Sequence, residues 1–236
     1  MKKTIVLILL FSTVISIAQN NDPIIPTSGN VVKDFVPQGW KKIALANGDL
    51  NKDGVDDFIL IVENKSTLNL KKNTALGSDT LNLNPRILII LFGELYGGYK
   101  TAEVNKNIIP TASSEVTPCL ADPMDEGNLE VKKDVLLLKL QYWLNCGSWS
   151  VTNKTYSFRY QHNQFELIGY DETSFQKSTG ETTDKSINFS TKKKCTSTGG
   201  NMFSKDLNKP KTTCVPFEVD KLKTLKELTS ETEIEF

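Results

Sequence analysis

The sequence predicts a mainly β protein made of antiparallel sheets, and three features of the chain support this. Short apolar segments rich in β-branched and aromatic residues recur from residue 31 onward. Polar turn residues separate these segments, and only the last one has helical spacing. A chain of 236 residues, 39% of them hydrophobic, can bury the core of one such domain. We therefore expect a single β-rich domain over residues 31–236, arranged as a sandwich or a meander.

The first residues predict export from the cytoplasm. Two lysines precede an apolar stretch over residues 5–17, and the small residues Ser16 and Ala18 fit a cleavage site. An uncleaved anchor helix is the competing interpretation, but the stretch is shorter than the ~20 residues a membrane span needs. We expect a signal peptide over residues 1–18, a flexible arm over 19–30, and a periplasmic or secreted mature chain without a membrane span.

The four cysteines predict two disulfides, because compartments outside the cytoplasm permit them. Four cysteines allow three pairings, and proximity along the chain favours Cys119 with Cys146 and Cys195 with Cys214. A zinc site would need closely spaced cysteine pairs, which the sequence lacks. A catalytic thiol would need a histidine, and the single one, His162, lies in an expected hairpin turn.

Charge composition argues against nucleic acid as a partner. Lysine plus arginine and aspartate plus glutamate number 28 each, and the basic residues form no extended stripe. A nucleic-acid-binding domain would concentrate positive charge on one face. We expect no nucleic-acid partner.

The first two strands are expected over residues 58–63 and 86–93. Both are apolar on both faces, which is typical of strands in the middle of a covered sheet. The segment between them, residues 64–84, is polar and without clear periodicity. We interpret it as a long, flexible excursion from the sheet.

A second group of strands is expected to form an antiparallel meander. Alternation of apolar and polar residues and the turn residues between them predict this arrangement. The expected strands cover residues 128–133, 135–144, 156–160 and 165–170, with turns at Lys133–Asp134 and 162–164. Further along, residues 186–195 and 212–219 are expected to be edge strands joined by the second disulfide, and residues 220–228 a short helix.

The segment from Asp49 to Asp57 carries the pattern of a calcium-binding loop. Oxygen ligands fall at alternate positions, and Gly54 lies where a sharp bend needs a residue without Cβ. Calcium takes six to eight oxygen ligands in loose geometry, whereas zinc prefers nitrogen and sulfur. An EF-hand would place a glutamate at the twelfth position, which here is Leu60. The predicted ligands are Asp49, Asn51, Asp53, the carbonyl of Val55, and Asp57.

This loop resembles the calcium loop of FG-GAP or VCBS repeats, the blades of integrin-α-type β-propellers. The family pattern D-x-N-x-D-G-x-x-D followed by an apolar strand is matched by Asp49, Asn51, Asp53, Gly54 and Asp57. The resemblance covers residues 40–63 and occurs once, whereas propellers carry several repeats. It implies a calcium-bound turn and a meander like part of a propeller. Residues 147–175 also resemble secreted proteins of Gram-negative bacteria that carry the same single loop.

The acidic loop also has a simpler interpretation as a polar turn without metal, since Asp, Asn and Gly are common in turns. The three predicted ligand carboxylates lie within nine residues and repel one another, and a bound dication would offset that repulsion. A site filled by protein oxygens leaves few positions for a substrate, so the calcium is expected to be structural.

Two function classes remain open from the sequence. The favoured one is a calcium-stabilised, non-catalytic binding or structural module of the bacterial cell envelope, with a protein or glycan partner. The alternative is a glycosidase-like hydrolase whose catalytic carboxylates cannot be recognised from spacing. No common catalytic motif is present, so we expect no enzyme activity. Trp40, Trp143 and Trp149 could stack on sugars, but aromatic residues in β-rich proteins are more often core.

Overall fold

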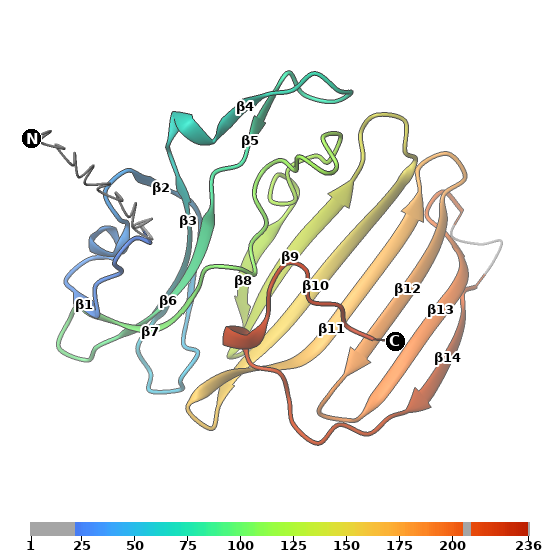
Figure 1. Cartoon of the computed structure of the whole chain (residues 1–236). Coiled ribbons are helices and arrows are strands. Elements are labelled where there is room, and N and C mark those ends of the chain that lie inside the picture. Colours follow the sequence, from blue (N-terminus) through green and yellow to red (C-terminus); the bar gives the residue numbers. More distant parts are fainter. Residues whose placement is uncertain (1–21, 205–208, 236) are drawn as a thin grey trace, which may run out of the picture.

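A computed structural model describes residues 22–204 and 209–235, and it confirms the predicted fold class. These residues form a five-stranded and a seven-stranded antiparallel sheet, together with one small two-stranded hairpin (Figure 1). The predicted signal peptide, residues 1–18, lies outside the described residues. Within the described ranges, no helix has the length and apolar character that a membrane crossing requires.

The first sheet has the strand order β1-β7-β6-β3-β2. The predicted strands over residues 58–63 and 86–93 are confirmed as β3 and β6. The bounds are β1 Ser28–Gly29, β2 Trp40–Gly48, β3 Asp57–Asn64, β6 Arg86–Gly93 and β7 Tyr99–Asn105.

Both central strands of the first sheet are apolar on both faces because each face is covered. Ile59 and Ile61 of β3 contribute to a large cluster shared with the second sheet. Leu60 and Val62 point the other way, into a smaller cluster that contains Trp40 and the short 3-10 helix η1, Val32–Phe35. The continuous apolar runs in the sequence therefore reflect burial on two sides.

The second sheet is an uninterrupted meander, in the order β14-β13-β12-β11-β10-β9-β8. The predicted two-residue turn at Lys133–Asp134 is confirmed, and the second turn consists of His162 and Asn163; all four residues have positive φ. The bounds are β8 Asn128–Lys132, β9 Val135–Trp143, β10 Ser150–Gln161, β11 Gln164–Gln176, β12 Glu181–Asn188, β13 Lys193–Asn201 and β14 Lys211–Pro216. Residues 186–195, expected as one strand, are divided between β12 and β13.

Two expected loose segments have more structure than their sequences suggested. In the excursion over residues 64–84, η2 Thr67–Asn69 leads into a hairpin of β4 Leu70–Lys72 and β5 Thr80–Asn82. In the described part of the arm, β1 pairs with β7, and Thr101 Oγ1 donates to the carbonyl of Pro26 at 2.6 Å. This part of the arm is thus attached to the first sheet.

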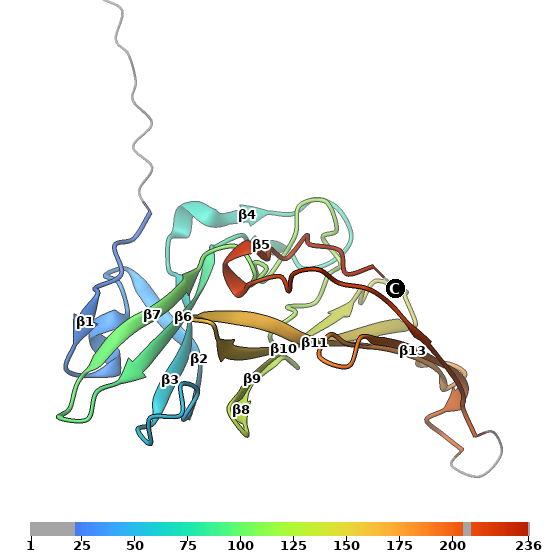
Figure 2. The ribbon, with the colours of Figure 1, turned by 90° about the horizontal axis from the view of Figure 1, so that it is seen from below.

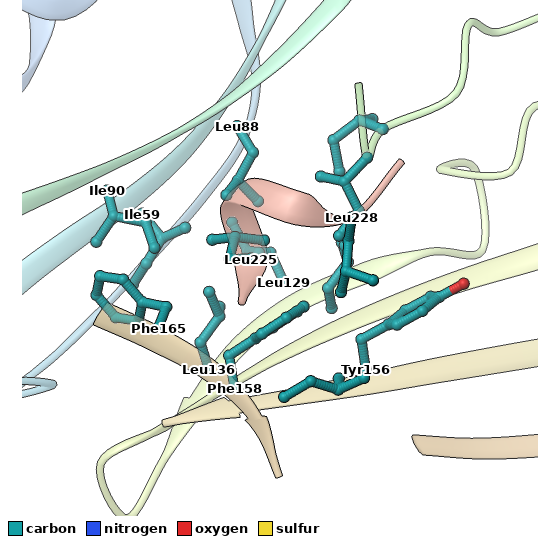
Figure 3. Close-up of a cluster of buried hydrophobic side chains, with 14 of the residues drawn as sticks. Ile59, Leu88, Ile90, Leu129, Leu136, Tyr156, Phe158, Phe165, Leu225 and Leu228 are labelled. Carbon is teal, nitrogen blue, oxygen red and sulfur yellow. The ribbon is translucent and has the colours of Figure 1, made fainter. Parts of the chain in front are cut away.

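The expected C-terminal helix is a single 3-10 turn, η3, Leu225–Glu227. The carbonyl of Lys223 accepts from Leu167 N–H of β11 at 2.9 Å, and Glu227 N–H, which an α-helix would direct to Lys223, donates to the carbonyl of Thr224 at 3.0 Å. Leu225 and Leu228 are buried in the large cluster. Figure 3 shows Leu225 between Leu88 of the first sheet and Leu136 of the second, so this turn closes the core where the sheets meet (Figure 2).

Both favoured disulfides are present, and the described residues contain no free cysteine. Cys119–Cys146 joins the connection before β8 to the segment that follows β9. Cys195–Cys214 lies between directly opposed residues of β13 and β14, with Cα atoms 4.1 Å apart. One disulfide therefore fixes the long connection and the other the last strand of the sheet.

A buried ion-pair network joins the first sheet to the connection that leads to the second. Arg86 of β6 is 3% exposed and donates from Nε to Glu63 Oε2 at 2.8 Å. Its Nη1 and Nη2 donate to the two carboxylate oxygens of Asp122, at 2.6 and 2.5 Å. Lys41 Nζ adds a contact of 2.9 Å to Glu63. Burial alone would raise the pKa of both carboxyls. Hydrogen bonds and charge from Lys41 and Arg86 at Glu63, and from Arg86 at Asp122, outweigh burial, so both pKa values are lowered.

We expect Arg86→Met to destabilise the protein by roughly 3 to 5 kcal/mol at pH 7, because it leaves the buried Glu63 with Lys41 alone and the partly buried Asp122 without its cation. Urea unfolding measures the loss. Since both folded-state pKa values are lowered, the parent should lose this contribution as pH falls below about 4, and the difference from the variant should shrink there. Lys100→Met, which breaks the exposed pair with Glu94, is the control and should cost under about 1 kcal/mol. A pH-independent difference would contradict the network's role.

Candidate metal site

The predicted calcium loop connects β2 to β3, and its first and last carboxylates have different surroundings. Gly48 and Asp57 are directly opposed residues that close the hairpin, so the loop residues 49–56 lie beyond the paired strands. Gly54 has φ +86°, which a residue with Cβ rarely adopts, and this explains glycine at the bend. The loop therefore has the tight coil that the sequence pattern requires.

The side chains of Asp49, Asn51 and Asp53 are brought together by hydrogen bonds inside the loop. Asp49 Oδ1 accepts from Lys52 N–H at 2.6 Å, and its Oδ2 accepts from Gly54 N–H at 3.0 Å. Asn51 Oδ1 accepts from Asp53 N–H at 3.0 Å, and Asn51 Nδ2 donates to Asp53 Oδ2 at 2.9 Å. Each of the three side chains thus interacts with the loop that carries it.

Val55 contributes to the hydrogen bonds inside the loop through its backbone N–H group. Its N–H donates to Asp53 Oδ1 at 2.8 Å, in the same pattern of a side chain that closes on the backbone two residues later.

Asp57 approaches from the inner side of the loop and is fully buried. Its Oδ2 accepts from the N–H groups of Leu50 and Asn51, at 2.8 and 3.3 Å, and its Oδ1 accepts from Gly93 N–H at 3.0 Å. Burial raises the pKa of this carboxyl, against the opposing effect of the three backbone donors. Asp57 therefore ties the loop to the β6–β7 hairpin as well as to its own strand.

The loop also contacts the second sheet. Lys52 Nζ lies 3.0 Å from Asp134 Oδ2 in the β8–β9 turn. At the base of the loop, a Cβ on Gly48 would lie 2.7 Å from Val131 of β8, and a Cβ on Gly93 would lie 2.5 Å from the carbonyl oxygen of Asp56. Such distances leave no room for a larger residue at either position. The loop is therefore in contact with β8 and with the end of β6.

The donor set suits calcium in chemistry, since every predicted ligand supplies a hard oxygen. The side-chain oxygens of Asp49, Asn51 and Asp53, however, already accept hydrogen bonds from the loop's own N–H groups. Across residues 22–204 and 209–235, no group of three or more acidic, histidine or cysteine side chains gathers closely enough to hold a metal. Ligation would exchange the internal hydrogen bonds of Asp49, Asn51 and Asp53 for contacts with the ion.

The tryptophans do not form one sugar-stacking platform. Trp40 is buried in the small cluster beneath η1. Trp143 lies at the end of β9, where its Nε1 donates to the carbonyl of Ser148 and Lys177 Nζ lies 3.3 Å from its ring centre. Trp149 is 61% exposed in the following connection. The expectation that aromatic residues serve the core holds for Trp40.

A polar cleft of about 400 Å³ is the feature that the sequence analysis missed. It lies between β2 and the segment 125–129, and Glu63, Arg86 and Asp122 line its floor. Arg86 and Asp122 are 36 residues apart in the sequence, and only the fold brings them together. The sequence did contain one indication of this buried ion pair: Arg86 and Glu63 are charged residues at the ends of the two most apolar strands of the chain.

Comparisons of the chain with models of protein families, with curated proteins and with solved structures find no match. The resemblance to FG-GAP or VCBS repeats therefore stays a prediction that rests on the loop residues themselves.

We expect Asp57→Ala to lower stability even in the presence of EDTA, by at least about 2 kcal/mol, because three backbone N–H groups lose a buried acceptor. Asp53→Ala is the matched variant: Asp53 is exposed, so its loss in EDTA should stay under about 1 kcal/mol. Chemical unfolding of both variants in EDTA makes the comparison. Equal losses would show that Asp57 is not a structural acceptor.

Proposed function

We propose that this protein is an exported, calcium-stabilised, non-catalytic binding or structural module of the bacterial cell envelope. The observation that carries the proposal is the position of the Asp49–Asp57 loop. Through Asp57 it is bonded to the β6–β7 hairpin, and through Lys52 it is paired with the β8–β9 turn. An ion held there would brace three hairpins at once.

The predicted ligands have distinct parts in this proposal. Asp49, Asn51 and Asp53 lie on the outer side of the loop and would supply side-chain oxygens, and Val55 would supply its carbonyl. Asp57 is the inner ligand and connects the site to the core. When bound, calcium would neutralise the mutual repulsion of the three carboxylates and stiffen the turn before β3.

A structural role for the ion is supported by the setting of the loop. Asp57 is fully buried and its oxygens accept backbone donors. The remaining loop acids engage the loop itself rather than line the polar cleft. These contacts favour a brace over a site that binds substrate.

The charge pattern of the polar cleft supports a non-catalytic role over the hydrolase alternative. A glycosidase needs one carboxyl whose pKa is raised so that it can donate a proton. In the cleft, Glu63 and Asp122 both have lowered pKa values, because hydrogen bonds from Lys41 and Arg86 to Glu63, and from Arg86 to Asp122, outweigh the effect of burial. Asp57 has a raised pKa but is enclosed in the hairpin junction.

Export is supported by the covalent structure. Two disulfides, Cys119–Cys146 and Cys195–Cys214, are consistent with an extracellular or periplasmic protein. The predicted signal peptide over residues 1–18 points to the same compartments.

We expect calcium to bind at ~0.1 to 1 mM, as in other extracellular modules. At tenfold excess over Kd the ion should stabilise the fold by about 1.4 kcal/mol. This raises Tm by roughly 3 to 6 °C in a domain of this size. Calorimetric titration and thermal unfolding measure the two effects, with magnesium at equal concentration as the control ion.

Asp53→Ala should remove both the heat of binding and the rise in Tm, because it deletes an outer ligand. An equal rise in Tm for Asp53→Ala and the parent would place the ion elsewhere, and no rise in the parent would refute calcium stabilisation.

A further inference from the structure

A second hollow, which we call the groove, lies on the face of the second sheet that also carries the large core cluster. Its volume is about 1130 Å³, above the roughly 300 to 1000 Å³ of pockets that hold single small molecules. The connection over residues 109–117 and the C-terminal residues 230 and 231 form its walls, and Figure 1 shows the C-terminal segment crossing the sheet. Its floor is formed by side chains at the adjoining ends of β9 and β10: Tyr142, Ser150, Thr152 and Lys154. The groove can therefore hold a ligand made of several units.

A disulfide holds one wall of the groove against its floor. Cys119 adjoins the lining residue Leu120, and Cys146 follows the lining residue Leu144 by two positions. Leu120 and Leu144 also pair as an isolated β-bridge, and Asn145 N–H donates to the carbonyl of Cys119 at 2.9 Å. A wall that is fixed before binding costs less ordering when a ligand enters. The groove is therefore preformed along this wall.

The backbone at the floor is already paired, so recognition in the groove depends on side chains. β10 pairs with β9 on one side and with β11 on the other. On the outer edge of β9, Gln141 N–H donates to the carbonyl of Pro123 at 3.0 Å, and the carbonyl of Trp143 accepts from Ala121 N–H at 2.9 Å. A peptide that adds to a sheet as a strand needs an unpaired strand edge. The described strands of the floor present their faces to the groove instead.

Hydroxyl groups dominate the polar part of the lining. Eight lining residues are serine or threonine, more than the five that carry a charge. A hydroxyl donates one hydrogen bond and accepts two, so it pairs readily with another hydroxyl. The side-chain hydroxyls of Thr117 and Ser150 make no hydrogen bond within residues 22–204 and 209–235. They are therefore free to pair with the hydroxyls of a ligand.

The charge of the lining favours a neutral ligand. Three of the five charged lining residues, Arg86, Lys106 and Glu115, form ion pairs with residues outside the groove. The other two, Lys154 and Glu231, make no ion pair within the described ranges and have opposite charges. Their charges cancel, so the groove attracts neither a cationic nor an anionic chain.

Tyr142 supplies an aromatic ring and an unused hydrogen-bond donor at the floor. Lys154 Nζ lies 5.1 Å from the centre of its ring. Its hydroxyl is buried and makes no hydrogen bond in the part of the chain that the structure describes. Burial, and next the charge of Glu231, raises the pKa of Tyr142 to about 12, so the hydroxyl keeps its proton. A ligand oxygen that reached it would satisfy this donor, and the ring suits the apolar C–H face of a sugar.

We propose that the groove binds a neutral oligosaccharide chain. The hydroxyls of Thr117, Ser150 and Tyr142 pair with sugar hydroxyls, and the ring of Tyr142 packs against a sugar ring. The inference rests on the proposed function as a binding module and gives it a ligand class.

The test uses four neutral hexasaccharides, cellohexaose, maltohexaose, laminarihexaose and chitohexaose, titrated into the isotope-labelled, disulfide-bonded protein with calcium present. At least one should bind, and the backbone amide signals of residues 111–117, 142–144 and 148–152 should shift. The disaccharide of the same sugar should bind at least about tenfold more weakly, because it fills less of the groove. Since the ligand is neutral, Kd should change by less than about twofold when salt is raised from about 0.05 to 0.5 M.

Tyr142→Phe separates binding from structure. It removes a buried hydroxyl that has no partner among the described residues, so the free energy of unfolding should not fall, whereas Kd for the bound hexasaccharide should rise about fivefold. Ser150→Trp, which fills the floor, should abolish binding. Tyr96→Phe, at a residue 99% exposed and outside the lining, is the control and should change neither quantity. Unchanged affinity in Ser150→Trp, or lower stability with unchanged affinity in Tyr142→Phe, would overturn the proposal.

The two disulfides provide a matched pair of variants. Replacing Cys119 and Cys146 with alanine frees the wall and should weaken binding by about tenfold, whereas replacing Cys195 and Cys214 with alanine should leave Kd unchanged. Equal weakening in both would contradict the preformed wall.

Three further outcomes would overturn the proposal: no binding of any of the four hexasaccharides, amide shifts outside the groove, or tighter binding of the acidic hexamer of galacturonate. A capped heptapeptide of alternating threonine and valine that shifts the groove signals while the sugars do not would do the same.

Repeating the titration in EDTA separates this proposal from the proposed function. Oligosaccharide binding without a calcium effect on Tm would refute calcium stabilisation and leave the groove proposal intact. A calcium effect on Tm without oligosaccharide binding would do the reverse, and shorter sugars detected by mass spectrometry after incubation would refute the non-catalytic role.

Discussion

The ion pairs of Arg86 connect the parts of this protein that are otherwise joined mainly by apolar packing. Arg86 and Glu63 are opposed on neighbouring strands, and Asp122 belongs to the connection that carries the chain from the first sheet to the second. Apolar contacts have no preferred direction, so they can hold two sheets together without fixing their relative position. A guanidinium held by two carboxylates in a buried site is directional, because each hydrogen bond limits its geometry. The entry into β8 is therefore fixed against β6.

The Asp49–Asp57 loop performs a related task at the opposite end of β2. Its inner carboxylate, Asp57, is bonded to Gly93, and Lys52 is paired with Asp134. A buried carboxylate is costly, as its raised pKa shows, and the three backbone donors offset part of that cost. A buried charged residue therefore connects neighbouring segments at each end of β2. Arg86 does so beneath the cleft, and Asp57 does so beneath the loop.

The sequence could predict the features that depend on local chemistry. Strands β3 and β6 follow from apolar runs, and the β8–β9 and β10–β11 turns from short polar interruptions between alternating segments. Proximity along the chain selected both disulfides. The contact between β2 and β8 could not be predicted in the same way, because nothing in the sequence of an edge strand indicates which other strand lies beside it. Likewise, nothing in the sequence distinguishes Asp122 from the other acidic residues, and only the fold shows that it pairs with Arg86.

The C-terminal segment shows why local spacing can mislead. Leu222, Leu225 and Leu228 recur every third residue, which fits a helix, but Leu225 and Leu228 are held by the core and by Asn105, whose Nδ2 donates to both of their carbonyls, at 2.6 and 2.9 Å. The Leu225 carbonyl also accepts from Leu228 N–H at 3.2 Å, so Asn105 binds the two carbonyls in the spacing of a 3-10 turn. Tertiary contacts therefore decide the conformation of this segment, leaving only one 3-10 turn.

The loop and the cleft are two ends of the same pair of strands, and this has a thermodynamic consequence. The separation of β2 and β8 is set next to the loop by Gly48, Val131 and the Lys52–Asp134 pair. A ligand that bound more tightly to one separation than to another would shift the loop toward the matching state, and an ion that stiffened the loop would shift the cleft. Linkage makes the two effects equal in free energy.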